Sequence, residues 1–269
     1  MREELKRLKL AKFRERFEDL AGQAAEEGWS HIDYLGRLVK EELLAREENQ
    51  LRRRMKWARF PFEKSLEQFD FRFRPELKKQ VFQRYIDDSF VYGGKSLVFI
   101  GPAGTGKTHL SVAIGLKLIT RGFKVRCVTV QELINKALES NQSQRRKLLK
   151  PLMECDVLIL DELGYLPAED AVGPLLYELI SNRYEKKATL VTSNKSLGEW
   201  GKILGDSSLA GALIDRLLHH GEVYYLSGDS YRMRGKQLSR KPMEEPEKGV
   251  RSSQTKNRSE KKPTKRASQ

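Results

Sequence analysis

Residues 101–108 read GPAGTGKT and fit the pattern G-x-x-x-x-G-K-[S/T] at every fixed position. They follow an apolar run at residues 96–100 and precede an amphipathic stretch that begins near Lys107. In this strand–loop–helix context the pattern forms a phosphate-binding loop, because glycines let backbone N–H groups curl around phosphate oxygens and the helix start adds a favourable dipole. We prefer this interpretation to a plain glycine-rich turn before a helix.

The loop predicts a nucleotide site with ATP and Mg²⁺ as its cofactors. We expect Lys107 to reach the β and γ phosphates, where it also serves catalysis, and the Thr108 hydroxyl to ligate Mg²⁺. The predicted nucleotide-binding residues are Gly101, Pro102, Ala103, Gly104, Thr105, Gly106, Lys107, Thr108 and His109.

Two carboxylates, Asp161 and Glu162, follow the apolar run at residues 157–160. Open α/β sheets bind ligands at the carboxyl ends of their strands, so we expect both acids to face the phosphates. Asp161 is predicted to be a Mg²⁺ ligand, and Glu162 the catalytic group that orients and polarises the attacking water. The alternative is a pair of acids that begins a loop.

Asn194 follows the next apolar run, residues 189–191, and is predicted to emerge at the same sheet edge as Asp161. There its amide can contact the γ-phosphate or the attacking water, which makes Asn194 a catalytic candidate. A lone asparagine after a strand is by default a turn residue, and this alternative stays open.

Arg216 is a further catalytic candidate, in the segment LIDRLL at residues 213–218. The leucines are expected to form the buried face of a helix, so that Arg216 can be offered as an arginine finger to the ATP of a neighbouring subunit. A surface arginine paired with Asp215 is the alternative. His219 and His220 end this helix, where they complement the helix dipole.

The alternation of apolar runs with helical segments predicts the fold class, α/β. Such alternation is typical of a parallel sheet covered by helices on both faces. Pro75 suits a first helical position, and a helix is expected from there through Ile86. The five β-rich runs are residues 96–100, 124–130, 156–160, 188–192 and 222–226.

Three parts are predicted along the chain. Residues 1–67 are expected to form a small all-helical domain, in which Gly28 separates a first helix from a second that starts near Ser30. Residues 68–240 are expected to form the ATPase domain. Residues 241–269 contain almost no apolar side chains and are predicted to be a disordered basic tail.

The formal net charge of +14, with a pI of about 9.7, predicts a polyanionic partner, and nucleic acid is the first candidate. Part of this charge can instead serve solubility. Basic residues are dense at the end of the predicted helical domain, around an aromatic ring that can stack on bases. A solvated helix face is the equally open alternative. The DNA-binding candidates are Arg52, Arg53, Arg54, Lys56, Trp57 and Arg59.

The composition favours a cytoplasmic protein without a membrane partner. The sequence has no uninterrupted apolar run of the ~20 residues that a membrane span needs, and the charged N-terminus lacks the layout of a signal peptide. Cys127 and Cys155 lie beside or within apolar runs and are expected to be buried. Two cysteines and four histidines in no ligand spacing do not predict a zinc site.

With these motifs placed, the chain resembles the IstB-like helper ATPases of bacterial insertion sequences, a branch of the AAA+ proteins similar to the DnaC helicase loaders. The resemblance runs from Leu5 to Arg234 and is more specific from DELGYLP onward than in the phosphate loop alone. It is carried by SLVFIGPAGTGKTHL (96–110), DVLILDELGYLP (156–167), ELISNRYEKKATLVTSN (178–194), EWGKILGD (199–206), ALIDRLLHH (212–220) and GDSYRMR (228–234).

The resemblance implies an AAA+ core with a five-stranded parallel sheet, Asn194 as the sensor 1 residue and Arg216 as the box VII arginine finger. It implies an ATPase that self-assembles on double-stranded DNA as an ATP-dependent homo-oligomer and assists a transposase encoded alongside it, by stimulation and target selection. A DnaC-like helicase loader and, from another class, a P-loop small-molecule kinase are the alternatives.

Most AAA+ proteins carry a helical lid with a sensor 2 arginine. Here only residues 227–240 lie between the last predicted strand and the tail, so a full lid is not expected. Arg232 and Arg234 are the residues that could take the place of sensor 2.

Overall fold

The computed structural model describes residues 1–164 and 172–234. The predicted disordered tail, residues 241–269, lies outside the described residues, as does the YLP part of the DELGYLP segment.

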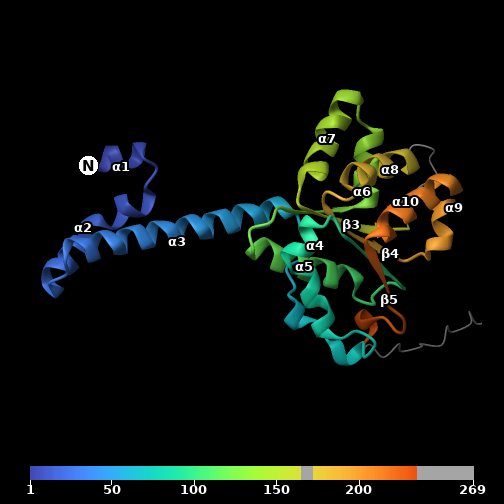
Figure 1. Ribbon diagram of the computed structural model, residues 1–269, viewed down its shortest axis with the longest axis horizontal. Coiled ribbons are helices and arrows are strands. Elements are labelled where there is room, and N and C mark those ends of the chain that lie inside the picture. Colours follow the sequence, from blue (N-terminus) through green and yellow to red (C-terminus); the bar gives the residue numbers. More distant parts are fainter. Residues whose placement is uncertain (165–171, 235–269) are drawn as a thin grey trace, which may run out of the picture. The chain divides into compact units, whose positions relative to one another are not determined.

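The core of the described chain is a five-stranded parallel sheet with the strand order β2-β3-β4-β1-β5 (Figure 1). All four neighbouring pairs are parallel, so the strands end at one edge: Ile100 pairs with Ser193, and Thr129 pairs with Asp161. The predicted α/β class and five-stranded parallel sheet are confirmed. The strands are β1 Ser96–Ile100, β2 Val125–Thr129, β3 Val157–Leu163, β4 Ala188–Ser193 and β5 Gly221–Tyr225.

Helices cover both faces of the sheet because alternate strand residues point to opposite sides. Leu97 and Phe99 belong to a hydrophobic cluster under α5, whereas Val98 and Ile100 belong to a second cluster under α6 to α10. The fully buried runs of the central strands fit this double cover. These helices are α4 Asp88–Tyr92, α5 Lys107–Thr120, α6 Val130–Leu138, α7 Gln142–Glu154, α8 Val172–Arg183, α9 Trp200–Leu204 and α10 Ser207–His219.

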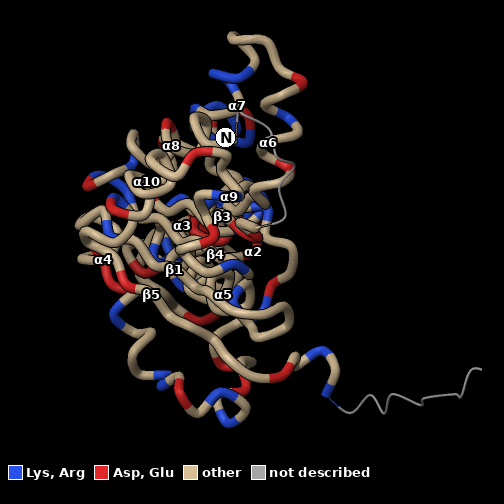
Figure 2. Tube along the Cα trace, turned by 90° about the vertical axis from the view of Figure 1, so that its right-hand side faces the viewer, with Lys and Arg blue, Asp and Glu red and all other residues tan. Residues whose placement is uncertain are grey.

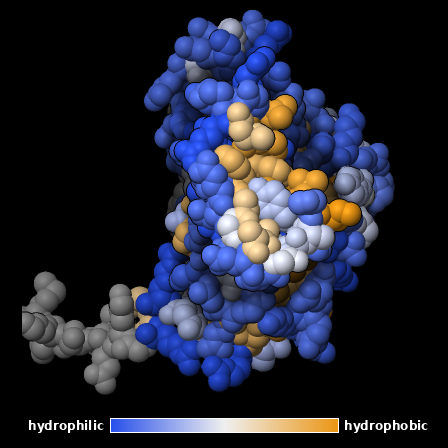
Figure 3. Space-filling model, turned by 90° about the vertical axis from the view of Figure 1, so that its left-hand side faces the viewer, coloured by the Kyte–Doolittle hydropathy of each residue, from blue (hydrophilic) through white to orange (hydrophobic). Residues whose placement is uncertain are grey.

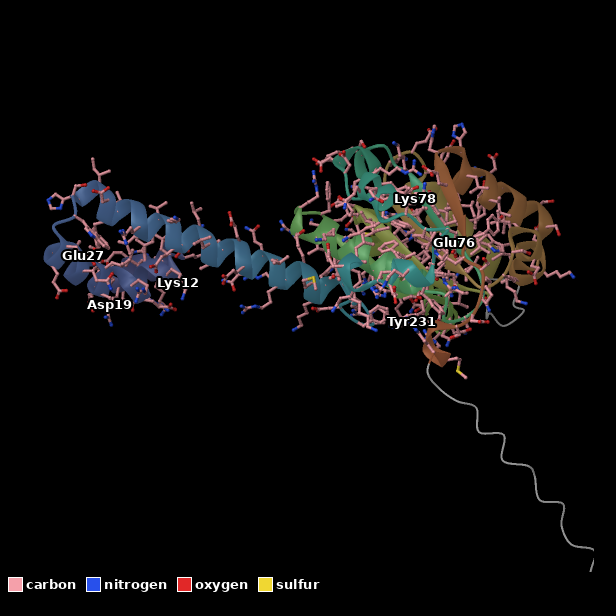
Figure 4. All side chains as sticks on the ribbon, turned by 90° about the horizontal axis from the view of Figure 1, so that it is seen from below. Lys12, Asp19, Glu27, Glu76, Lys78 and Tyr231 are labelled. Atoms are coloured by element: carbon pink, nitrogen blue, oxygen red, sulfur yellow. The ribbon has the colours of Figure 1, made fainter. Side chains whose placement is uncertain are left out.

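The N-terminal helices are α1 Arg2–Arg7, α2 Ala11–Glu27 and α3 His31–Ala58. Gly28 ends α2 in a left-handed conformation, and the Ser30 hydroxyl caps α3 by accepting a hydrogen bond from the Asp33 N–H at 3.1 Å. Helices α2 and α3 pack together, and Figure 4 marks Lys12 and Asp19 on α2. The Lys12 N–H donates to Glu42 of α3 at 2.7 Å.

The end of α3 joins the sheet region, since Ala58 lies in the cluster under α5 and α3 contacts both β2 and α5. Met1–Arg234 forms one compact unit. The division at residue 67 into a helical domain and an ATPase domain stays a prediction.

The expected α-helix from Pro75 to Ile86 is wrong. Residues Lys79–Tyr85 form a 3₁₀ helix, and α4 begins later, at Asp88. Phe82 and Tyr85 are both buried in the cluster under α5, and a 3₁₀ helix aligns residues three apart on one side. The other 3₁₀ turns are Leu66–Gln68, Phe71–Phe73, Leu197–Glu199 and Tyr231–Met233.

Candidate nucleotide site

The glycine-rich loop lies between β1 and α5, as its sequence pattern requires. Gly104 and Gly106 have φ values of +80° and +101°, which side chains with a Cβ rarely adopt. A Cβ at Gly104 would lie 1.9 Å from Ser230 Oγ, and one at Gly106 would lie 2.6 Å from the Phe69 ring. Glycine therefore permits both the turn of the loop and the close approach of its neighbours.

Lys107 begins α5 and its ammonium group lies over the loop. Nζ donates hydrogen bonds to the carbonyl oxygens of Gly101 and Pro102, each at 2.7 Å. Burial lowers the pKa of Lys107, while the charge of Asp161 acts in the opposite direction. The backbone oxygens of the loop thus hold the amine beside the loop, whose N–H groups would bind a phosphate.

Thr108 and Asp161 come together from two different elements. The Thr108 hydroxyl, in the first turn of α5, donates to Asp161 Oδ1 at 2.9 Å, and the Thr192 hydroxyl of β4 donates to the same oxygen. Asp161 is only 3% exposed. A hydroxyl beside a buried carboxylate is a pair of hard oxygen donors, so these residues fit Mg²⁺.

Glu162 is the next residue of β3 and has a left-handed backbone, with φ of +62°. Its N–H donates to the Thr192 hydroxyl at 2.9 Å, and its side chain is exposed and lines the cavity. The turn of the backbone therefore sends Asp161 into the protein and leaves Glu162 facing the cavity.

Asn194 follows β4 and also lines this cavity. Its amide oxygen is buried and has no hydrogen-bond partner among the described residues. A Cβ at Gly164 would lie 2.0 Å from that oxygen, so the absence of a side chain at Gly164 makes room for the Asn194 amide. A buried polar atom without a partner is expected to serve a ligand or a bound water.

One cavity of about 450 Å³ is lined by Lys107, Thr108, Glu162 and Asn194. Asp161 lies beside it and is hydrogen-bonded to the lining residues Thr108 and Thr192. Of the predicted loop residues, Ala103, Gly104, Thr105, Gly106, Lys107, Thr108 and His109 line it. Gly101 and Pro102 instead supply the carbonyl oxygens that hold Lys107. The His109 ring lies edge-on to Phe69 at 5.3 Å between ring centroids, and burial lowers the pKa of His109.

Sequence reasoning missed the part of the cavity wall that residues 62–74 form. This wall is rich in aromatic rings, which can pack against the flat face of a nucleotide base. Tyr231, marked in Figure 4, joins it from the far end of the chain, and its N–H donates to the Gly104 oxygen at 3.0 Å. The signal that could have revealed the wall is the run FRFRP at residues 71–75. The residues of 62–74 that line the cavity are Phe62, Lys64, Gln68, Phe69, Asp70, Phe73 and Arg74.

Arg74 ties the loop to the last described segment. It is 5% exposed, and its guanidinium donates to the backbone oxygens of Thr105 and Asp229. Five donors in a planar group suit this bridging of two backbones. Arg74 therefore holds the GDSYRMR segment against the loop.

The two arginines proposed as replacements for sensor 2 have different surroundings. Arg232 lines the cavity, and its charge contributes to the lowered pKa of Lys107. Arg234 instead forms an ion pair with Asp70, with 2.8 Å between Nη1 and Oδ2. The geometry favours Arg232 over Arg234 for contact with a nucleotide.

Arg216 does not line the cavity of its own chain. It lies on α10, where its guanidinium donates to the Ala212 oxygen at 3.1 Å and stands 4.6 Å from the centre of the Tyr177 ring. No ion pair joins it to Asp215 in the described part of the chain.

The basic residues at the end of α3 are also outside the cavity. Arg52, Arg53, Lys56 and Arg59 are exposed, whereas Arg54 is half-buried. The Trp57 ring packs on the core, and the Arg126 guanidinium lies 5.3 Å from its centre. One face of Trp57 is therefore occupied by Arg126.

A parallel sheet of this order, with a phosphate loop after β1 and paired acids at the end of β3, defines the AAA+ class of P-loop proteins. Two solved structures share the fold. The DnaC helicase loader is 22% identical with a TM-score of 0.50, covering 61% of this chain and 96% of that one. DnaI is 23% identical with a TM-score of 0.54, covering 61% and 91%.

The chain belongs to the family of IstB-like ATP binding proteins, whose family model matches residues 3–239. It is 36% identical over 233 residues to a protein of Geobacillus stearothermophilus named as an ATP-binding protein of insertion sequence IS5376, covering 86% of this chain and 93% of the relative. It is 37% identical over 233 residues to its counterpart in insertion sequence IS21 of Pseudomonas aeruginosa, covering 86% and 88%.

The resemblance inferred from the motifs is thus confirmed.

Among the described helices, none combines the length and the apolar character that a membrane span requires.

Proposed function

We propose that the chain is an ATPase that converts ATP and water to ADP and phosphate, assembles on double-stranded DNA as an ATP-dependent homo-oligomer, and assists a transposase. The observation that carries the ATPase proposal is the 2.9 Å hydrogen bond between Thr108 and the buried Asp161, at a cavity that Thr108 and Lys107 both line. The names of the relatives place them in insertion sequences, which supports a transposase as the partner.

The residues that carry the chemistry of the site have separate proposed tasks. Loop N–H groups and Lys107 bind the phosphates, and Thr108 and Asp161 hold Mg²⁺, which neutralises phosphate charge when bound. Glu162 orients the attacking water and accepts its proton. The amide oxygen of Asn194, which has no hydrogen-bond partner within residues 1–164 and 172–234, accepts a hydrogen bond from that water.

Arg216 and Arg232 are proposed to act on the same nucleotide from different chains. Arg232 is in the cavity of its own chain, so it would contact phosphate in cis. Arg216 is outside that cavity, so it would reach the phosphate of a neighbouring subunit and couple hydrolysis to assembly.

Charge and apolar surface support the DNA and assembly parts of the proposal. Lysines and arginines are spread along the described chain, including the end of α3 (Figure 2), and counterion release would favour their binding to phosphates. Ile32, Leu35, Val39 and Leu43 follow one another along α3 and are exposed. Figure 3 shows apolar side chains gathered on the face that presents the N-terminal helices. We assign this surface to self-assembly or to the transposase.

The proposal is tested by ATP hydrolysis with and without duplex DNA, combined with a gel shift of duplex DNA by the ATP-bound protein. Stimulation by DNA and an ATP-dependent shift are expected. An ATPase rate that duplex DNA does not change, together with no gel shift of the DNA, would refute the proposed binding to DNA. A pull-down can separate the two candidate partners. If it recovers a hexameric replicative helicase and no transposase, the result would favour a helicase loader.

A further inference from the structure

A cluster of metal-ligating side chains lies on the surface where α8 and α10 end, and none of its members lines the nucleotide cavity. It consists of Glu185, His219 and His220, whose ligand atoms all lie within 4.8 Å of one another. Glu185 Oε1 is 3.1 Å from His220 Nε2 and 3.6 Å from His219 Nδ1. The side chains are 51%, 53% and 46% exposed, so an ion in solution can reach them.

We propose that Glu185, His219 and His220 bind a divalent transition metal ion, with Zn²⁺ as the best match. Two imidazole nitrogens and one carboxylate oxygen are the ligand set of open tetrahedral zinc sites. Zinc bonds of about 2.0–2.1 Å in a tetrahedron place neighbouring ligand atoms about 3.3 Å apart. The two separations from Glu185 Oε1, 3.1 and 3.6 Å, lie on either side of that value.

A tyrosine hydroxyl lies beside the three ligands of the cluster. The Tyr184 hydroxyl lies 2.6 Å from His219 Nδ1. When Nδ1 binds the ion, it exchanges this hydrogen bond for the metal bond, so the Tyr184 hydroxyl must move aside, and a water can fill the fourth position. The site therefore has three ligands and an adjustable fourth position.

The backbone that carries Glu185 is held firmly. Glu185 lies in the turn between α8 and β4 with φ of +59°, and a Cβ at Gly94 would meet its carbonyl carbon at 2.4 Å. Arg183, two residues before Glu185, is 1% exposed. Its guanidinium donates hydrogen bonds to the backbone oxygens of Leu152, Cys155 and Ala188. The turn thus cannot shift without breaking a buried network.

The two histidines are anchored by the sheet. The His220 oxygen accepts a hydrogen bond from the Ser96 N–H at 3.4 Å, and the next residue, Gly221, begins β5 and pairs with Ser96 of β1. The two imidazole rings are in contact, with 4.0 Å between their centroids and an angle of 52° between their planes. Ligands on a fixed scaffold lose little conformational entropy on binding, which favours the ion over a loose surface contact.

The charge state suits a cation. The Glu185 carboxylate brings one negative charge to the cluster, and its Oε1 lies 3.1 Å from His220 Nε2. One carboxylate with two neutral imidazoles leaves a divalent ion partly compensated, as in open zinc sites. The competing explanation is a plain hydrogen-bonded pair between Glu185 and protonated histidine, which binds no metal.

The test is titration of the nucleotide-free, full-length chain with Co²⁺, read by its visible absorption, and with Zn²⁺, read by calorimetry. One equivalent is expected to bind with micromolar affinity. Glu185→Gln and His220→Gln should each weaken binding by about tenfold or more. All three ligands are exposed, so circular dichroism and the melting temperature without metal should not change.

Two control variants decide between sites. His31→Gln removes an exposed histidine elsewhere in the chain and should leave the titration unchanged. Asp161→Asn removes the carboxylate proposed for Mg²⁺, and one equivalent of Co²⁺ should still bind. The proposal is overturned by the absence of saturable binding, by equal binding in Glu185→Gln and the unmodified chain, or by loss of binding in either control.

Discussion

The Thr108 hydroxyl donates a hydrogen bond to Asp161 Oδ1 at 2.9 Å, although 53 positions separate the two residues in the chain. Parallel strands bring them together, because β1 leads into the loop before Thr108 while β3 ends at the same sheet edge with Asp161. Lys107, Glu162 and Asn194 lie around this pair.

Lys107→Ala should abolish nucleotide binding, because it removes the cation that reaches the phosphates. Calorimetry with ATP and magnesium measures this directly. Lys117→Ala is the matched control, since Lys117 lies on the same helix and pairs with Glu67 outside the nucleotide site. Normal ATP binding by Lys107→Ala would contradict the assigned role.

Glu162→Gln should keep nucleotide affinity while hydrolysis falls on the order of a hundredfold or more, because a neutral amide cannot accept the proton of the attacking water. Phosphate release and nucleotide titration, run on the same preparation, separate the two quantities. Unchanged turnover would assign the proton acceptor elsewhere.

Gly164→Ala should lower the turnover number about tenfold or more with little effect on nucleotide binding. The added Cβ would lie 2.0 Å from the Asn194 amide oxygen, at a φ of +152°, so the amide must move. Gly198→Ala is the control, since nothing lies within 4 Å of its Cβ. Equal rates in both variants would show that the position of Asn194 is irrelevant to hydrolysis.

Arg232→Ala should weaken nucleotide binding or hydrolysis more than Arg234→Ala. Arg232 lines the cavity, whereas the Arg234 guanidinium is engaged in an ion pair with Asp70. Steady-state kinetics of both variants makes the comparison. The reverse order would identify Arg234 as the nucleotide contact.

Arg216→Ala should lose hydrolysis and regain part of it on mixing with Glu162→Gln. In a mixed oligomer, the intact site of an Arg216→Ala subunit can lie beside the intact Arg216 of a Glu162→Gln subunit. Such an interface can hydrolyse ATP if the arginine acts in trans. The measurement is ATPase rate against mixing ratio. A mixture no more active than its separate components, or a fully active monomeric Arg216→Ala, would exclude the finger.

Local pattern was sufficient for the strands, the phosphate loop and the two acids near the carboxyl end of β3. Each depends on residues adjacent in the chain: an apolar run sets a strand, glycines set the loop, and the first polar residues after a buried strand must lie at its edge. The cap of α3 at Ser30 and the end of α2 at Gly28 were predictable for the same reason.

Long-range packing determined what pattern could not reveal. Pro75 suggested an α-helix, but burial of Phe82 and Tyr85 on one side favours 3₁₀ geometry. Arg74 is held by the hydrogen bonds that it donates to the backbone oxygens of Thr105 and Asp229, and Asp229 lies 155 positions away in the chain. The histidines had no ligand spacing in the chain, yet the turn after α8 brings Glu185 beside them.

The order of residues alone was enough to establish a phosphate loop facing strand-end carboxylates, because backbone conformation and strand burial respond to near neighbours. Folding in three dimensions was needed to place Arg232 in the cavity, to leave Arg216 outside it, and to give Asn194 its space opposite Gly164. These relationships depend on distances between segments far apart in the chain, and such distances are set by the packing of the whole core.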